Sequence, residues 1–596
     1  MHMIHDTRYM MYMIVIISNM LPDHIPVESA ARGAGPVTMD GGLQADVATS
    51  AQHRCDGGPL FGEPDVSRTV LDAAASTLRE LLLLHGYTAD VAIQRSCTTA
   101  AAGGPPGGDE FFGQRHESRL APLVQDAQGA LILLYLTGRA VHVQSVEAAL
   151  GAEAVAQLLT LGLLVHDADE SGSSSRMVLS PVQVYPLALA TAEESQRTVF
   201  VCTDWDVASA LDRRFTVMPI GIDSLQLAIG LPPASTAGRA VLDVCCGSGI
   251  QAIVAAAHGA ADVLATDVSE RAVRFTSFNA ALNALGRVLR TAVGGCFEPA
   301  RGERFDVVLA NPPFVAVPHA EIVRPALYVS GGVDGADVVR ELVRGAAAAG
   351  EGGVLRAGGC LLLVAQLPNI ETAHEWLSLA AEPTASERPS DLPAGGETAT
   401  GGPLPQLQPH LTVVYDPQHT QSADCYAAAH AADAGCSGRA WARALRAAGV
   451  GSMGFGIVIV TQSRGCADSS PSRPTARRVL VPRLAGAGAS TATMLHGPGL
   501  ALLRGCIELM QEQQQEEQDA GQSTGTSVAA GRPDLGPLRS VGSKLEALLA
   551  RGGGRGESAG GFTYQVGTRG VLRRESASRE RPGLHDLDAH MMRHQQ

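Results

Sequence analysis

The sequence contains almost no lysine. Lys544 is the single lysine among 596 residues, so arginine supplies nearly all of the positive charge. Because arginine codons can be GC-rich and lysine codons are AT-rich, we interpret this as a genome bias with little bearing on function.

Acidic residues outnumber basic ones, and the net charge is −15. This charge argues against a protein whose whole surface binds nucleic acid, although a local basic groove remains compatible with it.

Paired cysteines and long apolar runs are also missing. The 11 cysteines are odd in number and include no Cys-x-x-Cys pair, so we expect thiols in a reducing compartment and no metal site. The apolar run from Met10 to Met20 is too short to span a bilayer, and it lacks the flanks of a signal peptide. These absences predict a cytoplasmic protein with no membrane partner, with an organelle as the alternative location.

The chain is too long for one core, and its patterns divide it into four parts. Residues 1–64 are punctuated by Gly and Pro and are expected to be a disordered leader. Residues 65–200 carry helical patterns followed by two strand-like runs around a turn, which predicts a helical, winged-helix-like module. Residues 201–463 alternate strand and helix patterns, interrupted by a low-complexity insertion at 383–409 that we expect to be disordered. The remaining 464–596 are expected to be largely disordered.

The alternating region predicts the fold class. Its strand patterns are almost wholly apolar, which is typical of parallel strands covered on both faces. We therefore expect an α/β fold with a Rossmann-like, seven-stranded, mostly parallel doubly wound sheet. The last two strands have one predicted helix between them, which suits an antiparallel pair at the edge of the sheet.

The stretch "VLDVCCGSGIQA" is a strand, a glycine-containing turn and a helix. Gly247 and Gly249 allow a sharp turn and a close approach of the backbone to a ligand, and the helix start offers free N–H groups. The spacing alone also fits a dinucleotide loop. Asp243 just before the turn favours a ligand with an amino group and a cationic centre, because it would repel a pyrophosphate. Asp267 closes the next strand, where a carboxylate can accept both hydroxyls of a ribose.

A second motif follows the fourth strand of the region, in "FDVVLANPPF". Pro312 and Pro313 cannot continue the sheet and stiffen the turn. The Asn311 carboxamide oxygen and the Pro312 carbonyl are then expected to face outward together, as two acceptors for one planar –NH₂ group. Phe314 can stack on the face of that group. For an isolated Asn-Pro-Pro a simple strand end is the better interpretation, but here the turn follows the cofactor loop and the ribose carboxylate in order.

Together these motifs resemble class I S-adenosyl-L-methionine-dependent methyltransferases of the Asn-Pro-Pro-Phe/Tyr type, the HemK-like or "methyltransferase small domain" family. The resemblance covers roughly residues 200–463, and "FEP" and "GGVDG" on either side of the turn are most similar to the HemK-like branch. It implies S-adenosyl-L-methionine as cofactor. The implied cofactor-binding residues are Asp243, Cys245, Gly247, Gly249, Asp267 and Asn311, and the implied catalytic residues are Asn311, Pro312, Pro313 and Phe314.

The chain departs from the family pattern at three places. Cys245 stands where the family has its first glycine, and Phe314 where the HemK-like branch usually has Tyr. A family Asp that touches the adenine is replaced around Gly295 and Cys296.

The resemblance leaves several functions open. The first is N-methylation of a protein glutamine, such as that of a translation release factor. The second is methylation of an RNA or DNA base, at adenine N6 or guanine N2. The acidic charge favours the protein substrate, so the expected partner is a macromolecule, a protein before a nucleic acid. A non-catalytic cofactor-binding module and a nicotinamide-dependent oxidoreductase are the alternatives of other classes, and no Tyr-x-x-x-Lys supports the latter.

Overall fold

A computed structural model describes residues 60–61, 66–98, 126–167, 176–190, 196–205, 216–231, 233–317, 326–348, 353–381, 407–433, 437–464, 475–480, 563–566 and 572–575. Among these residues, no helix combines the length and the apolar character that crossing a bilayer requires.

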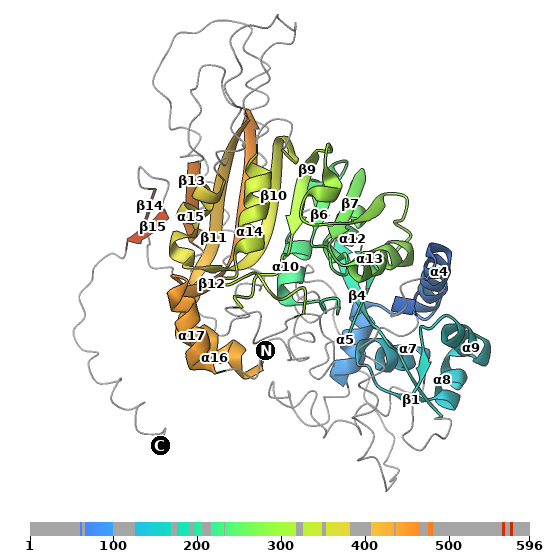
Figure 1. Cartoon of the computed structure of the whole chain (residues 1–596). Coiled ribbons are helices and arrows are strands. Elements are labelled where there is room, and N and C mark those ends of the chain that lie inside the picture. The colour runs from blue at the N-terminus through green and yellow to red at the C-terminus, as the bar shows by residue number, and fades with distance from the viewer. Residues whose placement is uncertain are drawn as a thin grey trace, which may run out of the picture.

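An eight-stranded sheet forms the centre of the structure, in the order β13-β11-β12-β10-β9-β6-β7-β8 (Figure 1). Only β12 is antiparallel to its neighbours; every other pair in this sheet is parallel. The fold is therefore α/β and Rossmann-like, with a mostly parallel sheet. Its strands are β6 (Ala240–Val244), β7 (Asp262–Asp267), β8 (Leu289–Val293), β9 (Phe305–Ala310), β10 (Leu355–Pro368), β11 (Leu407–Ser422), β12 (Ser452–Arg464) and β13 (Thr475–Leu480).

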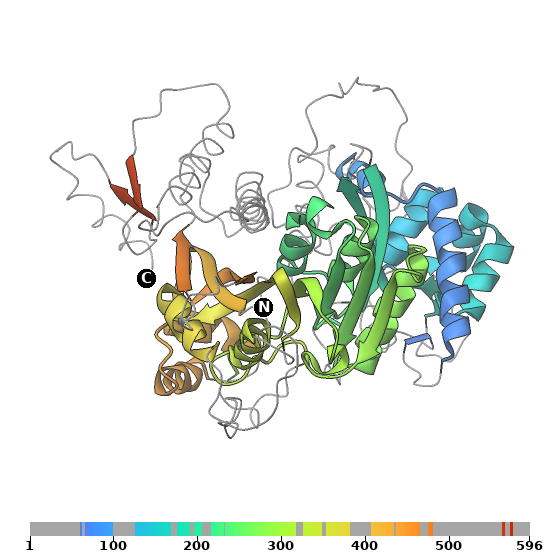
Figure 2. The same cartoon turned by 90° about the horizontal axis from the view of Figure 1, so that it is seen from above.

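Helices cover both faces of this sheet (Figures 1 and 2). Val241 and Val307 belong to one buried cluster, with α12 and α13, whereas Leu242 and Val308 belong to the other, with α14 and α15. Apolar residues on both faces explain why these strands show no polar alternation. The helices of this region are α10 (Ile222–Gly230), α11 (Pro233–Thr236), α12 (Ile250–Ala257), α13 (Glu270–Leu282), α14 (Asp337–Ala347), α15 (Ala373–Ala380), α16 (Ala423–Asp433) and α17 (Gly438–Ala447), with 3₁₀ turns η5 (Glu298–Ala300) and η7 (Ile370–Thr372).

The N-terminal part combines helices with a small three-stranded sheet of order β1-β3-β2 and a separate hairpin of β4 and β5. β3 pairs antiparallel with both β1 and β2. The elements are α4 (Arg68–Leu84), α5 (Ala89–Thr98), α7 (Ala127–Leu131), the π-helix η3 (Ile132–Leu136), β1 (Val141–His142), α8 (Val143–Leu150), α9 (Ala152–Thr160), β2 (Val165–His166), β3 (Met177–Leu179), β4 (Gln183–Ala190) and β5 (Gln196–Thr203).

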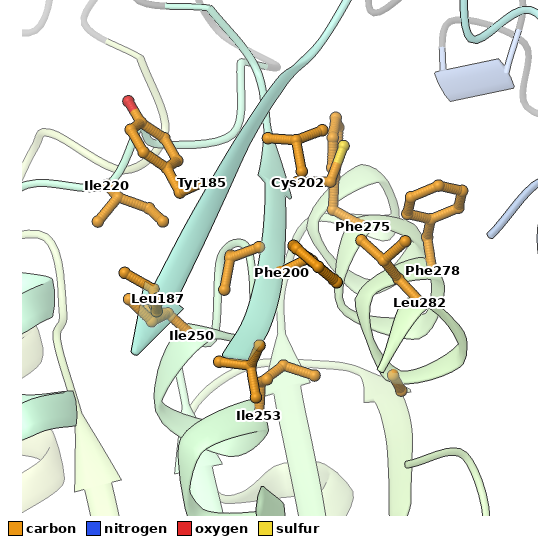
Figure 3. Close-up of a cluster of buried hydrophobic side chains, with 14 of the residues drawn as sticks. Tyr185, Leu187, Phe200, Cys202, Ile220, Ile250, Ile253, Phe275, Phe278 and Leu282 are labelled. Carbon is orange, nitrogen blue, oxygen red and sulfur yellow. The ribbon is translucent and has the colours of Figure 1, made fainter. Parts of the chain in front are cut away.

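The β4–β5 hairpin joins this part to the central sheet. Two buried amides of α13 hydrogen bond to the β5 backbone: Asn279 accepts from the Cys202 N–H and donates to its carbonyl, and Asn283 does the same at Phe200, all at 2.7–2.8 Å. Figure 3 shows Phe200 among Ile253 of α12 and the apolar side chains of α13. The amides thus satisfy strand groups that have no sheet partner, and the hairpin and α13 share one core.

Two residues of the expected leader are ordered and buried, contrary to the prediction. Leu60 and Phe61 are helical, and the Phe61 ring stacks on Phe275 of α13 with centroids 3.9 Å apart. The Phe61 carbonyl also accepts hydrogen bonds from Arg271 and Arg274. A short apolar pair can anchor to a core even when the sequence around it is rich in Gly and Pro. The remainder of 1–64 lies outside the described residues.

The two late strands, β11 and β12, pair antiparallel as predicted. Three details were wrong: β13 adds an eighth strand, it lies outside β11 so that the pair is not at the edge, and two helices rather than one lie between β11 and β12. β12 itself lies in the interior of the sheet, between β10 and β11. An interior position buries both faces of its apolar "GIVIV" run, as the composition already indicated. β11 also begins at Leu407, inside the segment 383–409 that was expected to be disordered, and the rest of that insertion lies outside the described residues.

The expected boundary between residues 200 and 201 falls inside β5. Within 464–596 the structure describes β13 and the hairpin of β14 (Thr563–Val566) and β15 (Leu572–Glu575), which the sequence analysis did not anticipate. The predicted domain limits otherwise stay predictions.

Candidate functional site

The carboxyl ends of three neighbouring strands bring the predicted site residues together. β6 lies between β9 and β7, and Val244 at its end is level with Ala310 and Thr266. Asp243, Asp267 and Asn311 therefore lie at one edge of the sheet, where ligands of open parallel sheets bind.

The turn after β6 has the backbone geometry that its glycines predict. Gly247 and Gly249 have φ values of 54° and 78°, in the left-handed region. A Cβ on Gly249 would lie 2.5 Å from Cγ2 of Thr276, so any side chain there collides with α13. A Cβ on Gly247 would meet nothing within 4 Å, which leaves the backbone open on that side.

Cys245 adopts the same left-handed region, with φ of 58°, although it carries a side chain. This conformation costs a non-glycine residue roughly 1–2 kcal/mol.

We expect Cys245→Gly to raise the free energy of unfolding by about 1 kcal/mol, because glycine adopts this φ without strain. Urea unfolding would measure the change. Cys246→Gly is the matched control: Cys246 is buried and has no positive φ, so its loss should destabilise. Equal destabilisation by both variants would contradict the prediction.

Asp267 ties the turn to β7. Its Oδ2 accepts from the Gly247 N–H at 3.0 Å, and its Oδ1 accepts from the Ser269 N–H at 2.8 Å. Burial raises the pKa of this carboxyl, and the backbone donors of Ser269 and Gly247 oppose that rise. Each oxygen keeps a further lone pair, so the carboxylate can hold the turn and still accept from a ligand hydroxyl.

Asp243 is completely buried at the end of β6. Its Oδ2 accepts from the Ala252 N–H at 3.0 Å, while its Oδ1 has no partner among the described residues. Burial raises the pKa of Asp243 to about 8; the hydrogen bond from the Ala252 N–H opposes this rise, and repulsion from Asp267 adds a smaller increase. A buried acceptor without a donor is unfavourable, and a cationic ligand amine would supply the donor. This unpartnered oxygen fits the ammonium of an amino-acid-containing cofactor.

Apolar side chains remain exposed beside Asp267. Val268 and Val293 are 54% and 48% exposed, although both lie at strand ends next to the site. A Cβ on Gly295 would touch only Cγ1 of Val268, at 3.8 Å, so the surface is open there. Such a surface can receive the face of a flat heterocycle. Cys296 next to it has φ of 42°, and burial with the nearby Glu341 raises the pKa of its thiol to about 12.

The Asn311 amide is held from one side only. Its Nδ2 donates to Oδ2 of Asp223 at 3.0 Å and to Oγ of Ser224 at 3.1 Å. Its Oδ1 is buried and has no partner among the described residues. Asp223 and Ser224 lie in the first turn of α10 and are themselves buried. Neither residue was predicted from the sequence, although the polar pair inside the apolar pattern "IDSLQLAIG" was a signal.

Prolines 312 and 313 end β9 as expected. Among the described residues, no donor hydrogen bonds to the Pro312 carbonyl. The Phe314 ring meets Phe455 of β12 edge to face, with centroids 6.1 Å apart. The "GGVDG" loop supports the turn from behind: the Gly331 N–H donates to the Val315 carbonyl, and a Cβ on Gly335 would lie 2.5 Å from the Phe314 carbonyl oxygen.

A second support comes from the α16–α17 pair, of which only α17, the helix that contains Trp441, was predicted from the sequence. The Tyr426 hydroxyl accepts from the Ala316 N–H at 3.0 Å, and Nε1 of Trp441 donates to the Ala316 carbonyl at 3.1 Å. Both bonds are buried, so the chain leaving Phe314 is fixed on two sides. The stiffness of this turn therefore comes from tertiary contacts as well as from its prolines.

The part of the chain that holds these residues is similar to known methyltransferases. Residues 226–318 match the family model of ribosomal protein L11 methyltransferase (PrmA). This range contains the turn after β6, Asp267 and the whole Asn-Pro-Pro-Phe motif. The matching part of the chain is thus methyltransferase-like.

The chain is also similar to curated proteins that are named as glutamine methyltransferases. The ribosomal protein uL3 glutamine methyltransferase of Bradyrhizobium diazoefficiens is 39% identical over 118 residues, which cover 19% of this chain and 37% of the relative. The release factor glutamine methyltransferase of Xylella fastidiosa is 38% identical over 133 residues, covering 21% and 46%. The chain thus spans less than half the length of these relatives.

Among solved structures, ribosomal protein L11 methylase of Lactobacillus delbrueckii is 25% identical, with 27% of this chain and 70% of that chain covered and a TM-score of 0.20. Because this TM-score is low, the similarity supports no conclusion about function.

Proposed function

We propose that the protein is an S-adenosyl-L-methionine-dependent N-methyltransferase that acts on the side-chain amide of a glutamine in a protein substrate. The observation that carries the proposal is the Asn311 amide. Its nitrogen is bound to Asp223 and Ser224, and its buried oxygen has no partner among the described residues, at the same edge as Asp243 and Asp267. Two acceptors at a stiff turn match the two hydrogens of one planar amine.

The residues present fit the cofactor. Asp243 would hold its amino group, Asp267 its ribose hydroxyls, and the apolar surface of Val268 and Val293 its adenine face. When bound, S-adenosyl-L-methionine supplies a methyl group activated by the sulfonium sulfur. Asn311 and Pro312 would accept the two amide hydrogens and orient the nitrogen. Held in this way, the substrate nitrogen would face the methyl group that the cofactor supplies, and one amide proton would be lost to solvent. Such orientation can contribute ~7–11 kcal/mol to lowering the barrier.

Two findings favour a protein over a nucleic acid as the substrate. The relatives are named as glutamine methyltransferases of a ribosomal protein and of release factors. We also propose that α7, β1, α8, α9, β2 and β3 form a winged-helix-like module, and neither α8 nor α9 carries a basic residue. A nucleic-acid surface needs such residues to neutralise phosphates. We therefore propose that this module supports the central sheet and contacts the protein substrate.

A transfer experiment tests this function. Purified protein and S-adenosyl-L-methionine labelled in the methyl group are incubated with a cell extract, and the labelled macromolecule is isolated. The expected label survives nuclease, is lost with protease, and is released by acid hydrolysis as volatile methylamine, because hydrolysis cleaves the methylated amide. Label lost with nuclease would identify the base-methylating alternative, and no transfer with any fraction would refute the enzyme.

The raised pKa of Asp243 predicts how stability depends on pH. In the unliganded protein this carboxyl keeps its proton up to pH about 8, whereas an unfolded chain loses it near pH ~4. The folded state therefore holds the extra proton between these limits, and this contribution to the free energy of unfolding is lost as the pH rises through the window. Asp243→Asn should flatten the decline, and urea unfolding from pH 5 to 8 measures it. Parallel pH profiles of wild type and variant would contradict this account.

A further inference from the structure

The orientation of the Asn311 amide is not determined by Asn311 itself. The two ends of a carboxamide have nearly the same shape, so the side chain can place either oxygen or nitrogen toward a ligand. Only the oxygen can accept an amine hydrogen. The groups behind Asn311 therefore decide whether the site presents an acceptor or a donor to its substrate.

Of the two groups behind the amide, only one discriminates. The Ser224 hydroxyl can accept or donate, so it tolerates either end of Asn311. An ionised Asp223 carboxylate only accepts, and it contacts Nδ2 at 3.0 Å. Turning the amide over would place Oδ1 against that carboxylate and lose the hydrogen bond. We propose that Asp223 is a positioning residue that keeps the oxygen of Asn311 facing the acceptor amine; this inference rests on the proposed function.

The backbone near Asp223 leaves space for the carboxylate of this residue. A Cβ on Gly221 would lie 2.4 Å from Oδ1 of Asp223, so glycine leaves the space that the carboxylate occupies. The segment before α10 is anchored as well: the Val217 N–H donates to Asp204 at 2.8 Å, and the Thr203 hydroxyl donates to the Met218 carbonyl at 2.9 Å. These contacts hold the start of α10 at the end of β5.

Three variants test the role of Asp223. Asp223→Asn keeps the shape but adds a donor, so both amide orientations become compatible with residue 223. Its kcat should fall about 10–100-fold, the usual cost of removing a supporting contact behind a site residue, with unchanged Kd for S-adenosylhomocysteine. Gly221→Ala should lower kcat in the same way, because it displaces the carboxylate without a backbone penalty at its φ of −93°. Ser224→Ala removes a contact that tolerates either end of the amide, so it should lower kcat less than Asp223→Asn does.

A double-mutant cycle separates positioning from general damage. If Asp223 acts through Asn311, then Asp223→Asn should have no further effect on kcat in an Asn311→Ala background. A loss that multiplies across the two sites, or wild-type kcat in both Asp223→Asn and Gly221→Ala, would overturn the inference.

A turnover-independent measurement keeps this inference distinct from the proposed function. With ¹⁵N-asparagine labelling, the side-chain NH₂ signal of Asn311 is identified by its loss in Asn311→Ala. We expect that signal to shift in Asp223→Asn and Gly221→Ala and to stay nearly unchanged when a distant exposed residue, such as Asp72, is replaced by alanine. If wild-type protein transfers no methyl group, the proposed function fails while this shift still supports the orientation. An unshifted signal refutes the positioning role whatever the activity.

Discussion

Asn311→Ala is expected to lower kcat ~10²–10³-fold, because it removes one of the two preorganised acceptors that hold the substrate amine. The affinity for S-adenosylhomocysteine should stay within a few-fold, since the cofactor carboxylates Asp243 and Asp267 lie on other strands. Single-turnover methyl transfer would give the rate, and calorimetric titration would give the Kd.

The Asn311→Ala substitution is also expected to affect the stability of the protein. Removing the Asn311 amide leaves the buried Asp223 carboxyl without its side-chain partner, so some loss of stability is expected. The rate is therefore compared at a temperature where unfolding measurements show both proteins folded. A folded variant that turns over like the wild type would remove Asn311 from the mechanism.

Asp267→Ala is expected to weaken cofactor binding. A charge-assisted hydrogen bond is worth ~1.5–3 kcal/mol, which corresponds to a rise in Kd of roughly 10–150-fold. The loss has two sources, because Asp267 also holds the Gly247 N–H at 3.0 Å and so keeps the turn in place. At saturating cofactor, kcat should change little, since the acceptor turn does not contact Asp267.

Asp262→Ala serves as the matched control for this prediction. Asp262 begins the same strand, at the opposite edge of the sheet, and forms an exposed ion pair with Arg290. Exposed pairs contribute ~0–1 kcal/mol, and this one lies away from the site. Unaltered cofactor affinity in Asp267→Ala, or an equal loss in both variants, would remove Asp267 from the binding site.

The positions of the site residues along the chain could be predicted because the relevant geometry is local. Strand, turn and helix around Gly247 and Gly249 follow one another without interruption, and their left-handed φ values are what the residue type favours. That the ends of parallel strands share one edge is a general property of α/β sheets. Knowing only the alternating pattern, one can therefore place Asp243, Asp267 and Asn311 at that edge.

The supports of the acceptor turn could not be predicted in this way. Tyr426 and Trp441 bind the Ala316 backbone from helices more than 100 residues away in sequence. The helix around Tyr426 was not predicted, and the last two strands were placed as a pair at the edge of the sheet, where β13 lies instead. Contacts between distant segments depend on how the strands are ordered, and hydrophobic patterns do not encode strand order.

The sequence by itself determined the class of sheet, the residues that end its strands, and thereby the chemical groups at one edge. Only the tertiary structure decided which way the Asn311 amide faces. That orientation depends on Asp223, 88 positions earlier in the chain. The physical reason is that composition and spacing place a side chain on an element, whereas its hydrogen-bond partner is chosen by whichever distant element packs against it.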